Sequence, residues 1–189
     1  MIIRHAEKPT GDGLVHGVSH VGAHDKHDLS VRGWQRAGAL VRFFAPVHQA
    51  PLHEFISTPR AIFASGVTRA RPSLRSQNTV APLAAALGIP VAVHHAEGEE
   101  EAVARAALEA DGPILISWHH KRIPDLVRII AGEEIRCPRY WPDDRFDVVW
   151  VLDHHEATDD WTFRQVPQRL LPHDRDDIIL VRHRLGAPS

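Results

Sequence analysis

Short apolar runs alternate with amphipathic stretches along the chain, and each pattern predicts one kind of element. Apolar runs predict strands at residues 2–3, 61–64, 91–93, 113–117, 148–152 and 178–181. Apolar residues at helical spacing predict helices at residues 31–44, 79–87, 99–110 and 124–131. Because strands alternate with helices, we expect a three-layer α/β/α fold with a mostly parallel central sheet.

The whole chain, residues 1–189, fits a single domain. It is 43% hydrophobic, which is enough to build one core. No internal repeat divides it, and the proline-bearing segment 137–145 is typical of a loop. Residues 9–28 are rich in Gly, His and Asp and have no apolar period, so we expect a longer loop there, of a kind that often carries function.

Charge and cysteine content restrict the expected environment of the protein. A formal net charge of −2 supplies no field that would attract nucleic acid or an anionic membrane, so neither is an expected partner. Cys137 is the only cysteine, which excludes a disulfide or a cysteine-based metal cage within the chain. The sequence has no secretory signal and no apolar stretch of the ~20 residues that span a membrane. We therefore expect a cytoplasmic protein.

Polar side chains follow three of the predicted strands at the point where each strand ends. Arg4 and His5 follow the first strand, and His119 and His120 follow the strand at 113–117. An arginine cluster follows the second strand and consists of Arg69, Arg71 and Arg75. In open parallel sheets, ligands bind beyond the carboxyl ends of the strands, so we expect these groups to meet. Guanidinium groups bind phosphate oxygens, and a neutral imidazole can attack phosphorus when its other nitrogen is held by a hydrogen bond. The set predicts phosphoryl transfer.

The segment at residues 4–9 reads R-H-A-E-K-P and resembles the R-H-G/A-E signature of the histidine phosphatase superfamily, which includes the phosphoglycerate mutases. The resemblance extends to about residue 132. It includes L-S-V-R-G-W-Q-R-A-G-A-L at residues 29–40, which is similar to the start of the family's first helix. The resemblance implies a phosphoglycerate mutase-like fold, with His5 as the phosphate acceptor and Arg4 as a phosphate ligand.

The arginine cluster allows two assignments for the family's next phosphate ligand. Residues 62–84 resemble the family's strand, S-x-x-x-R-A-x-x-T motif and helix, with a longer loop between them. Counting forward from Ser65 gives Arg69, whereas counting back from Thr79 gives Arg75. We favour Arg75, because an arginine in the turn before a helix can meet phosphate at the positive helix N-terminus. Arg69 remains the alternative.

The assignment of the second histidine is also open, between the neighbours His119 and His120. Residues 114–124 read I-L-I-S-W-H-H-K-R-I-P and resemble the family's strand followed by G-H-x-x-x-V/I, with Trp118 in place of the glycine. The resemblance implies that His119 is the second catalytic histidine and a phosphate ligand. His120 takes that role if Trp118 reorients the backbone.

A leaving alkoxide needs a proton, so we expect an acid between the arginine cluster and His119. Glu97 is the candidate. The alternative is that these acidic residues only stabilise a helix. The helix dipole favours negative charge in the first turn, where the carboxylates at residues 99–101 lie, and Glu97 just precedes that turn.

Two histidine groups raise the alternative of a metal site. His16, His20, His24 and His27 have a spacing that would place them on one helical face, but the glycines between them argue against a helix. We expect a structural or substrate-binding loop there, and a polar strand end at residues 153–155. No metal or other cofactor is expected. Cys137 has no evident partner base, and the chain has no G-x-S-x-G elbow and no glycine-rich nucleotide loop.

Together these patterns predict a histidine acid phosphatase-type phosphoric monoester hydrolase. It would act on a small-molecule phosphorylated substrate through a phosphohistidine on His5, with Arg4, Arg75 and His119 holding the phosphoryl group. One alternative is a phosphoglycerate mutase-type phosphotransferase, and another is a non-catalytic phosphate- or metal-binding relative. No pattern in the sequence predicts the substrate or the oligomeric state.

Overall fold

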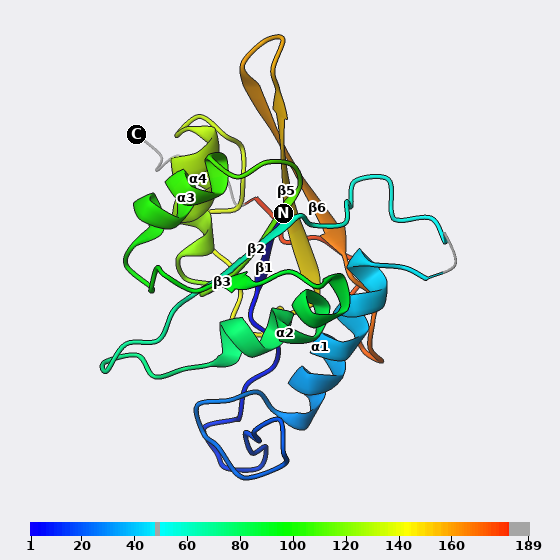
Figure 1. Ribbon diagram of the computed structural model, residues 1–189, viewed down its shortest axis with the longest axis vertical. Coiled ribbons are helices and arrows are strands. Elements are labelled where there is room, and N and C mark those ends of the chain that lie inside the picture. Colours follow the sequence, from blue (N-terminus) through cyan, green and yellow to red (C-terminus); the bar gives the residue numbers. More distant parts are fainter. Residues whose placement is uncertain (48–49, 182–189) are drawn as a thin grey trace, which may run out of the picture.

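The computed structural model describes residues 1–47 and 50–181, which form one six-stranded sheet and four helices (Figure 1). In chain order the elements are β1 (Ile2–Arg4), α1 (Val31–Phe44), β2 (Ala61–Ala64), α2 (Arg75–Leu87), β3 (Val91–Ala92), α3 (Glu100–Leu108), β4 (Ile114–Trp118), α4 (Ile123–Ala131), β5 (Val148–His155) and β6 (Asp160–Pro167). None of the helices within these residues is long and apolar enough to cross a membrane.

The sheet is mixed, with strand order β3-β2-β4-β1-β5-β6. Its first four strands are parallel, and β5 and β6 add an antiparallel hairpin beside β1. The mostly parallel α/β fold expected from the sequence is therefore confirmed. Because β1 lies between β4 and β5, the residues that follow its carboxyl end lie at the middle of that edge of the sheet.

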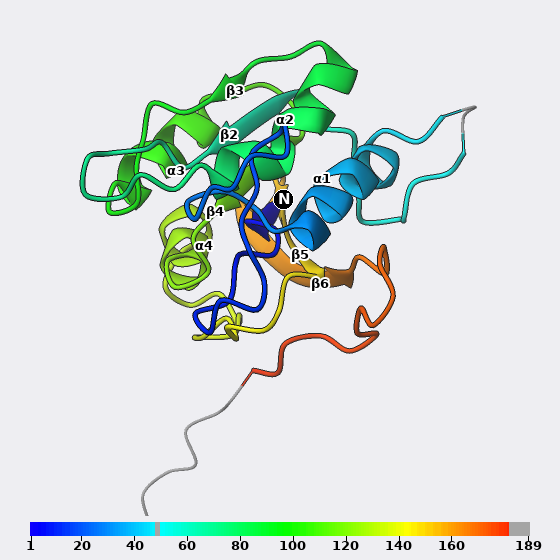
Figure 2. The same ribbon diagram turned by 90° about the horizontal axis from the view of Figure 1, so that it is seen from below.

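Alternating strand residues bury their side chains in two cores on opposite faces of the sheet. Ile2 packs in the core that also contains residues of α3 and α4, whereas Ile3 packs in the core under α1 and α2. The two helix pairs accordingly lie on opposite sides of the sheet (Figures 1 and 2). Both faces of β1 are covered, which explains why its apolar residues are contiguous rather than alternating with polar ones.

An N-cap and an apolar stripe along one face explain why residues 31–44 form helix α1. The Ser30 hydroxyl accepts a hydrogen bond of 3.1 Å from the Gly33 amide, and Ala37, Leu40 and Phe44 are buried on one face. Helix α2 begins at Arg75, four residues before the predicted start at residue 79. Leu74 occupies the N-cap position and has no side-chain acceptor, so the sequence carries no start signal there.

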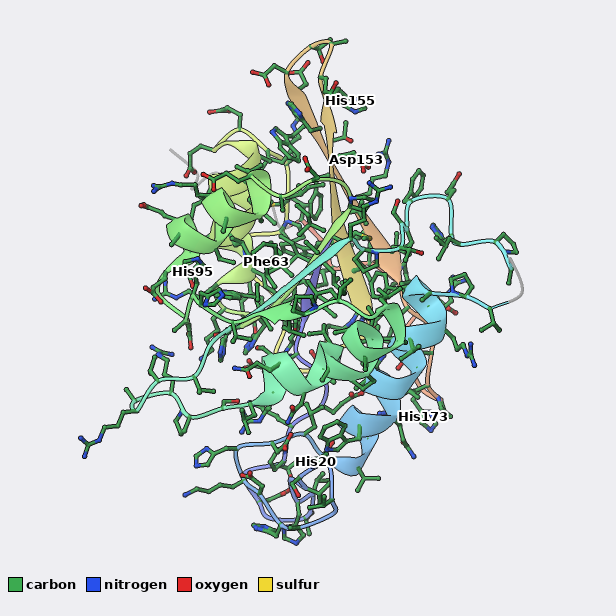
Figure 3. All side chains as sticks on the ribbon, in the orientation of Figure 1. His20, Phe63, His95, Asp153, His155 and His173 are labelled. Atoms are coloured by element: carbon green, nitrogen blue, oxygen red, sulfur yellow. The ribbon has the colours of Figure 1, made fainter. Side chains whose placement is uncertain are left out.

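The prediction of a strand at residues 178–181 is wrong, because these residues pair with no strand in the described part of the chain. The Ile179 amide instead donates to the side-chain oxygen of Gln165, and the Gln165 amide donates back to the Ile179 carbonyl, at 3.0 and 2.8 Å. The last strand is β6, which pairs with β5 along its full length. Figure 3 shows Asp153 and His155 on this hairpin, within the strand rather than in a loop after it.

Candidate active site

The carboxyl ends of β1 and β4 bring the two predicted histidine segments together. Arg4, the last residue of β1, is paired in register with Trp118, the last residue of β4. The next residue on each strand, His5 and His119, therefore leaves the sheet at the same edge. The two imidazole rings lie 6.1 Å apart between centroids and are nearly perpendicular.

The His5 side chain is buried and held in one tautomer. Its Nδ1 lies 2.7 Å from the carbonyl oxygen of Ala6, which can only accept a hydrogen bond, so Nδ1 carries the proton and Nε2 keeps a lone pair. Burial, followed by the charge of Arg4, holds the pKa of His5 well below its usual range. The ring is therefore neutral at pH 7.

A hydroxyl on α2 fixes the backbone that carries His5. The Thr79 Oγ1 accepts a hydrogen bond of 2.7 Å from the Ala6 amide and donates one of 2.7 Å to the Arg75 carbonyl. Thr79 is fully buried, so both bonds are shielded from water. The turn after β1 is thus tied to the first turn of α2, which starts with Arg75.

The Arg4 guanidinium is buried beside His5 with donors to spare. Its Nη1 donates to the carbonyl oxygens of Pro142, Asp143 and Arg145 at 2.7–3.1 Å. Within the part of the chain that the structure describes, its Nε and Nη2 have no hydrogen-bond partner. Burial lowers the pKa of Arg4 to about 10, so the group is still a cation at pH 7. A buried cation with unused donors is suited to an anion.

Both candidates for the second histidine lie next to His5. The His120 ring is 6.5 Å from that of His5, and its Nε2 lies 2.5 Å from Oδ1 of Asp143. Burial, followed by the charge of Arg4, lowers the pKa of His120 to about 4 and outweighs the attraction of Asp143. Burial also lowers the pKa of His119, whose Nδ1 lies 3.4 Å from Oε2 of Glu97.

The Glu97 carboxylate, the candidate acid, lies 3.4 Å from Nδ1 of His119. It also forms an ion pair with Arg71, an exposed residue of the arginine cluster. Its neighbours have local roles: Glu99 accepts a hydrogen bond from the Ala96 amide, and Glu100 is buried and accepts one from the Trp118 indole at 3.0 Å. The structure thus brings Glu97 to the site through His119.

The structure brings Arg75 to the site and leaves Arg69 outside it. Arg75 is half-buried, and its guanidinium donates to the carbonyl oxygens of Asp28 and Lys26 at 3.2 and 2.9 Å. Burial is the main cause of the low pKa of His5, but the nearby charge of Arg75 contributes to it. Arg69 lies on the surface of the longer loop. The added loop residues therefore precede Arg75, the arginine whose charge acts on His5.

A cavity of about 770 Å³ adjoins this cluster. Its lining includes Lys8, Lys26, Arg75 and the ring of Phe146, but neither Arg4 nor His5. The Phe146 ring lies 3.8 Å from the Arg4 guanidinium carbon and 6.1 Å from the His5 ring. Phe146 therefore contacts the buried Arg4 cation and also lines the cavity.

The sequence patterns missed two side chains of this site, Asp143 and Phe146. Arg71 belongs to the predicted arginine cluster, and the structure adds its ion pair with Glu97. Asp143 and Phe146 belong to the segment before β5, which carries no motif and reaches Arg4 only through the folding of the sheet. Glu7, next to the signature histidine, has a structural role, because it accepts hydrogen bonds from Arg36 at 2.8 Å and Arg32 at 3.1 Å.

The two histidine groups outside this site do not gather ligands. In residues 1–47 and 50–181, no group of three His, Cys, Asp or Glu side chains is arranged to hold a metal ion. Residues 9–28 form a loop without a helix, in which only the His16 and His24 rings approach each other, at 5.2 Å. On the hairpin, His154 stacks on Trp161 and bonds to Asp159 at 2.8 Å.

The fold is similar to that of a known protein histidine phosphatase, so the fold expected from the motifs is confirmed. The chain is similar to the structure of the protein histidine phosphatase SixA complexed with tungstate. The TM-score is 0.50 and the sequence identity is 16%, over 88% of this chain and 95% of that chain. No family model matches the sequence, and no curated protein matches it.

Proposed function

We propose that the protein hydrolyses a phosphate monoester through a phosphohistidine on His5. The observation that carries this proposal is the state of the His5 ring: its Nδ1 is held by the Ala6 carbonyl at 2.7 Å, and its Nε2 lone pair remains next to the buried Arg4. A neutral, oriented imidazole beside unused guanidinium donors has the composition of a phosphoryl acceptor site. The SixA structure contains tungstate, a tetrahedral oxyanion like phosphate, on the same fold.

In the first step, the His5 Nε2 lone pair attacks phosphorus and forms the N–P bond as the bond from phosphorus to the ester oxygen breaks. The leaving oxygen takes the electron pair and a proton, which Glu97 supplies from its protonated form, in which its ion pair with Arg71 is lost. Arg4 and Arg75 stabilise the charge on the phosphoryl oxygens. A bound phosphate dianion raises the pKa of His119, so that this ring becomes a charged donor to the same oxygens.

In the second step, water attacks the phosphorus of the intermediate in line with the N–P bond. Glu97, now ionised, takes a proton from that water, the N–P bond breaks, and its electron pair returns to Nε2 of His5. Inorganic phosphate leaves, and His5 is again neutral. No atom of the site is consumed, so the cycle can repeat.

Access to Arg4 requires a movement of Phe146. The ring lies 3.8 Å from the guanidinium carbon, and the segment that carries it accepts hydrogen bonds from Nη1 through three backbone carbonyls. A rotation of the Phe146 side chain uncovers the two unpartnered nitrogens without breaking those bonds. An anion that replaces the ring exchanges a cation–π contact for charge-assisted hydrogen bonds, which are stronger.

The burial of His5 favours a second candidate function, a non-catalytic phosphate binder with the same fold. His5 is 3% exposed and does not line the neighbouring cavity. If Phe146 stays in place, only the outer cations Lys8, Lys26 and Arg75 can reach a phosphate group. Such a protein binds phosphorylated ligands but has no turnover.

Turnover of 4-nitrophenyl phosphate separates the two candidates. The proposal predicts that His5→Asn abolishes hydrolysis, whereas the control His155→Ala, on the far end of the β5–β6 hairpin (Figure 3), does not change it. Asparagine keeps a side-chain amide that can donate to the Ala6 carbonyl, so the variant tests the nucleophile rather than the fold. Hydrolysis that survives in His5→Asn contradicts the proposal.

A further inference from the structure

The cavity beside the candidate active site has an excess of unpaired positive charge. Four cations and two carboxylates line it: Lys8, Lys26, Arg32, Arg75, Glu7 and Asp143. Both carboxylates have other partners, because Glu7 pairs with Arg32 and Arg36 and Asp143 bonds to His120. An unpaired cation at the wall of a cavity is a binding group for an anion.

The two lysines are the groups left without a partner. Arg32 is paired with Glu7 and Asp174, and Arg75 donates to two backbone carbonyls. Among the residues that the structure describes, the Lys8 and Lys26 ammonium groups form neither an ion pair nor a hydrogen bond with a side chain. Both lysines are exposed, so their charge is available to a molecule that enters the cavity.

Arg75 connects the lysines to the reacting histidine. Its Nη2 donates to the Lys26 carbonyl at 2.9 Å, and its side chain lines the same cavity. Partial burial, followed by the charges of Arg4 and Arg75, lowers the pKa of Lys8, which shows that Lys8 lies in the field of the two proposed phosphate ligands. A substrate whose phosphate meets Arg4 and Arg75 therefore extends towards Lys8 and Lys26.

We propose that Lys8 and Lys26 form a second anion subsite, so that the substrate is a small phosphate monoester with a second anionic group, a carboxylate or another phosphate. This inference rests on the proposed function, since it assumes that the first phosphate reacts at His5. The cavity of about 770 Å³ is large enough for a metabolite-sized molecule. A substrate without a second charge leaves the two ammonium groups unpaired and gains nothing from them.

Matched substrates test the subsite. One series consists of ω-carboxyalkyl phosphates of increasing chain length, and the other of the alkanediol monophosphates that carry a neutral hydroxyl in place of the carboxylate. We expect kcat/KM to favour the best carboxylate over its neutral partner by about tenfold, the effect of one charge-assisted contact. The preference must shrink as the salt concentration rises, because both lysines are exposed.

Three charge-matched variants locate the effect. Lys8→Gln and Lys26→Gln are expected to reduce the ratio of the two kcat/KM values towards one. Lys121→Gln removes the same charge from an exposed lysine that follows His120 but does not line the cavity, and it is expected to keep the ratio. An unchanged ratio in both Lys8→Gln and Lys26→Gln, or an equal loss in Lys121→Gln, overturns the subsite.

The subsite can also be tested without turnover. Calorimetric binding of the same pairs to His5→Asn is expected to show the tenfold preference, and Lys26→Gln in that background is expected to lose it. Hydrolysis of 4-nitrophenyl phosphate with no preference between the series refutes the subsite alone. Absence of any hydrolysis, together with a lysine-dependent binding preference, refutes the proposed reaction and leaves the subsite supported.

Discussion

The guanidinium carbon of Arg4 lies 3.8 Å from the centre of the Phe146 ring, and Phe146 lines the neighbouring cavity. The contact satisfies the charge of Arg4 in the absence of an anion. Two guanidinium nitrogens of Arg4, Nε and Nη2, are buried and have no partner among the described residues. The aromatic ring and a phosphate group therefore compete for the same cation.

Removal of this competitor is expected to tighten anion binding. Phe146→Ala uncovers Arg4 and removes a cation–π contact of about 1 kcal/mol, so the inhibition constant of inorganic phosphate should fall about fivefold. Phe146→Leu keeps most of the bulk without the aromatic face, so its inhibition constant should lie between those of the wild type and Phe146→Ala. Competitive inhibition of 4-nitrophenyl phosphate hydrolysis measures all three proteins. Weaker phosphate binding in Phe146→Ala contradicts the competition.

The two arginines that the sequence left open should differ in effect. Arg75→Gln removes a charge that acts on His5, and we expect kcat/KM to fall about 100-fold, as for the loss of one stabilising group in a transition state. Arg69→Gln should change kcat/KM less than twofold, since Arg69 lies on the surface of its loop. Steady-state kinetics of the two variants makes the comparison directly. A larger loss of kcat/KM in Arg69→Gln than in Arg75→Gln would contradict the assignment and show that Arg69 is the phosphate ligand.

The role of Glu97 depends on the leaving group. An alkoxide needs a proton from Glu97, whereas 4-nitrophenolate is stable without one. Glu97→Gln should therefore reduce kcat/KM, which reports the first transfer, by about 100-fold or more for an alkyl phosphate and much less for 4-nitrophenyl phosphate. Parallel losses on the two substrates exclude Glu97 as the acid. Glu101→Gln, in the first turn of α3, provides a matched control.

The buried histidines make the fold sensitive to acid. The pKa of His120 is about 4 in the folded protein, mainly because of burial, and 6.5 is its ordinary value. Between these values the unfolded chain binds more protons than the folded chain, so the free energy of unfolding falls as the pH is lowered from 6.5 towards 4. The slope per group approaches about 1.4 kcal/mol per pH unit.

Urea unfolding at a series of pH values measures this effect. Burial lowers the pKa of His5 and His119 too, and the wild type should lose stability steeply below pH 6.5. His120→Gln keeps a side-chain amide that can bond to Asp143 and removes one titrating group, so its slope should be shallower. An identical slope in wild type and variant means that His120 does not remain neutral in the fold.

Local patterns predicted most of the fold because most elements are short and bounded. The apolar runs of β2 and β4 and the capped stripe of α1 are visible in the sequence. The strand β6 was missed because most of its residues are only half-buried and its apolar pattern is weak. The run at residues 178–181 was mistaken for a strand because its backbone bonds to a glutamine side chain, which no hydropathy pattern reveals.

The residues of the candidate site also divide into those that the sequence could predict and those that it could not. Arg4, His5 and His119 could be found because each follows a strand of a parallel sheet, and sheet geometry brings such positions together. Phe146 and Asp143 could not be found, because they reach Arg4 across a separation of about 140 residues. Their contribution arises from tertiary packing alone.

Trapping the intermediate tests the central claim most directly. Wild-type protein is mixed with an alkyl phosphate, quenched in alkali, where phosphohistidine survives, and digested for mass spectrometry. We expect a phosphoryl group on the peptide that contains His5, its loss on brief treatment with acid, and none in His5→Asn. Steady hydrolysis with no phosphate on His5 at any time point would contradict the account.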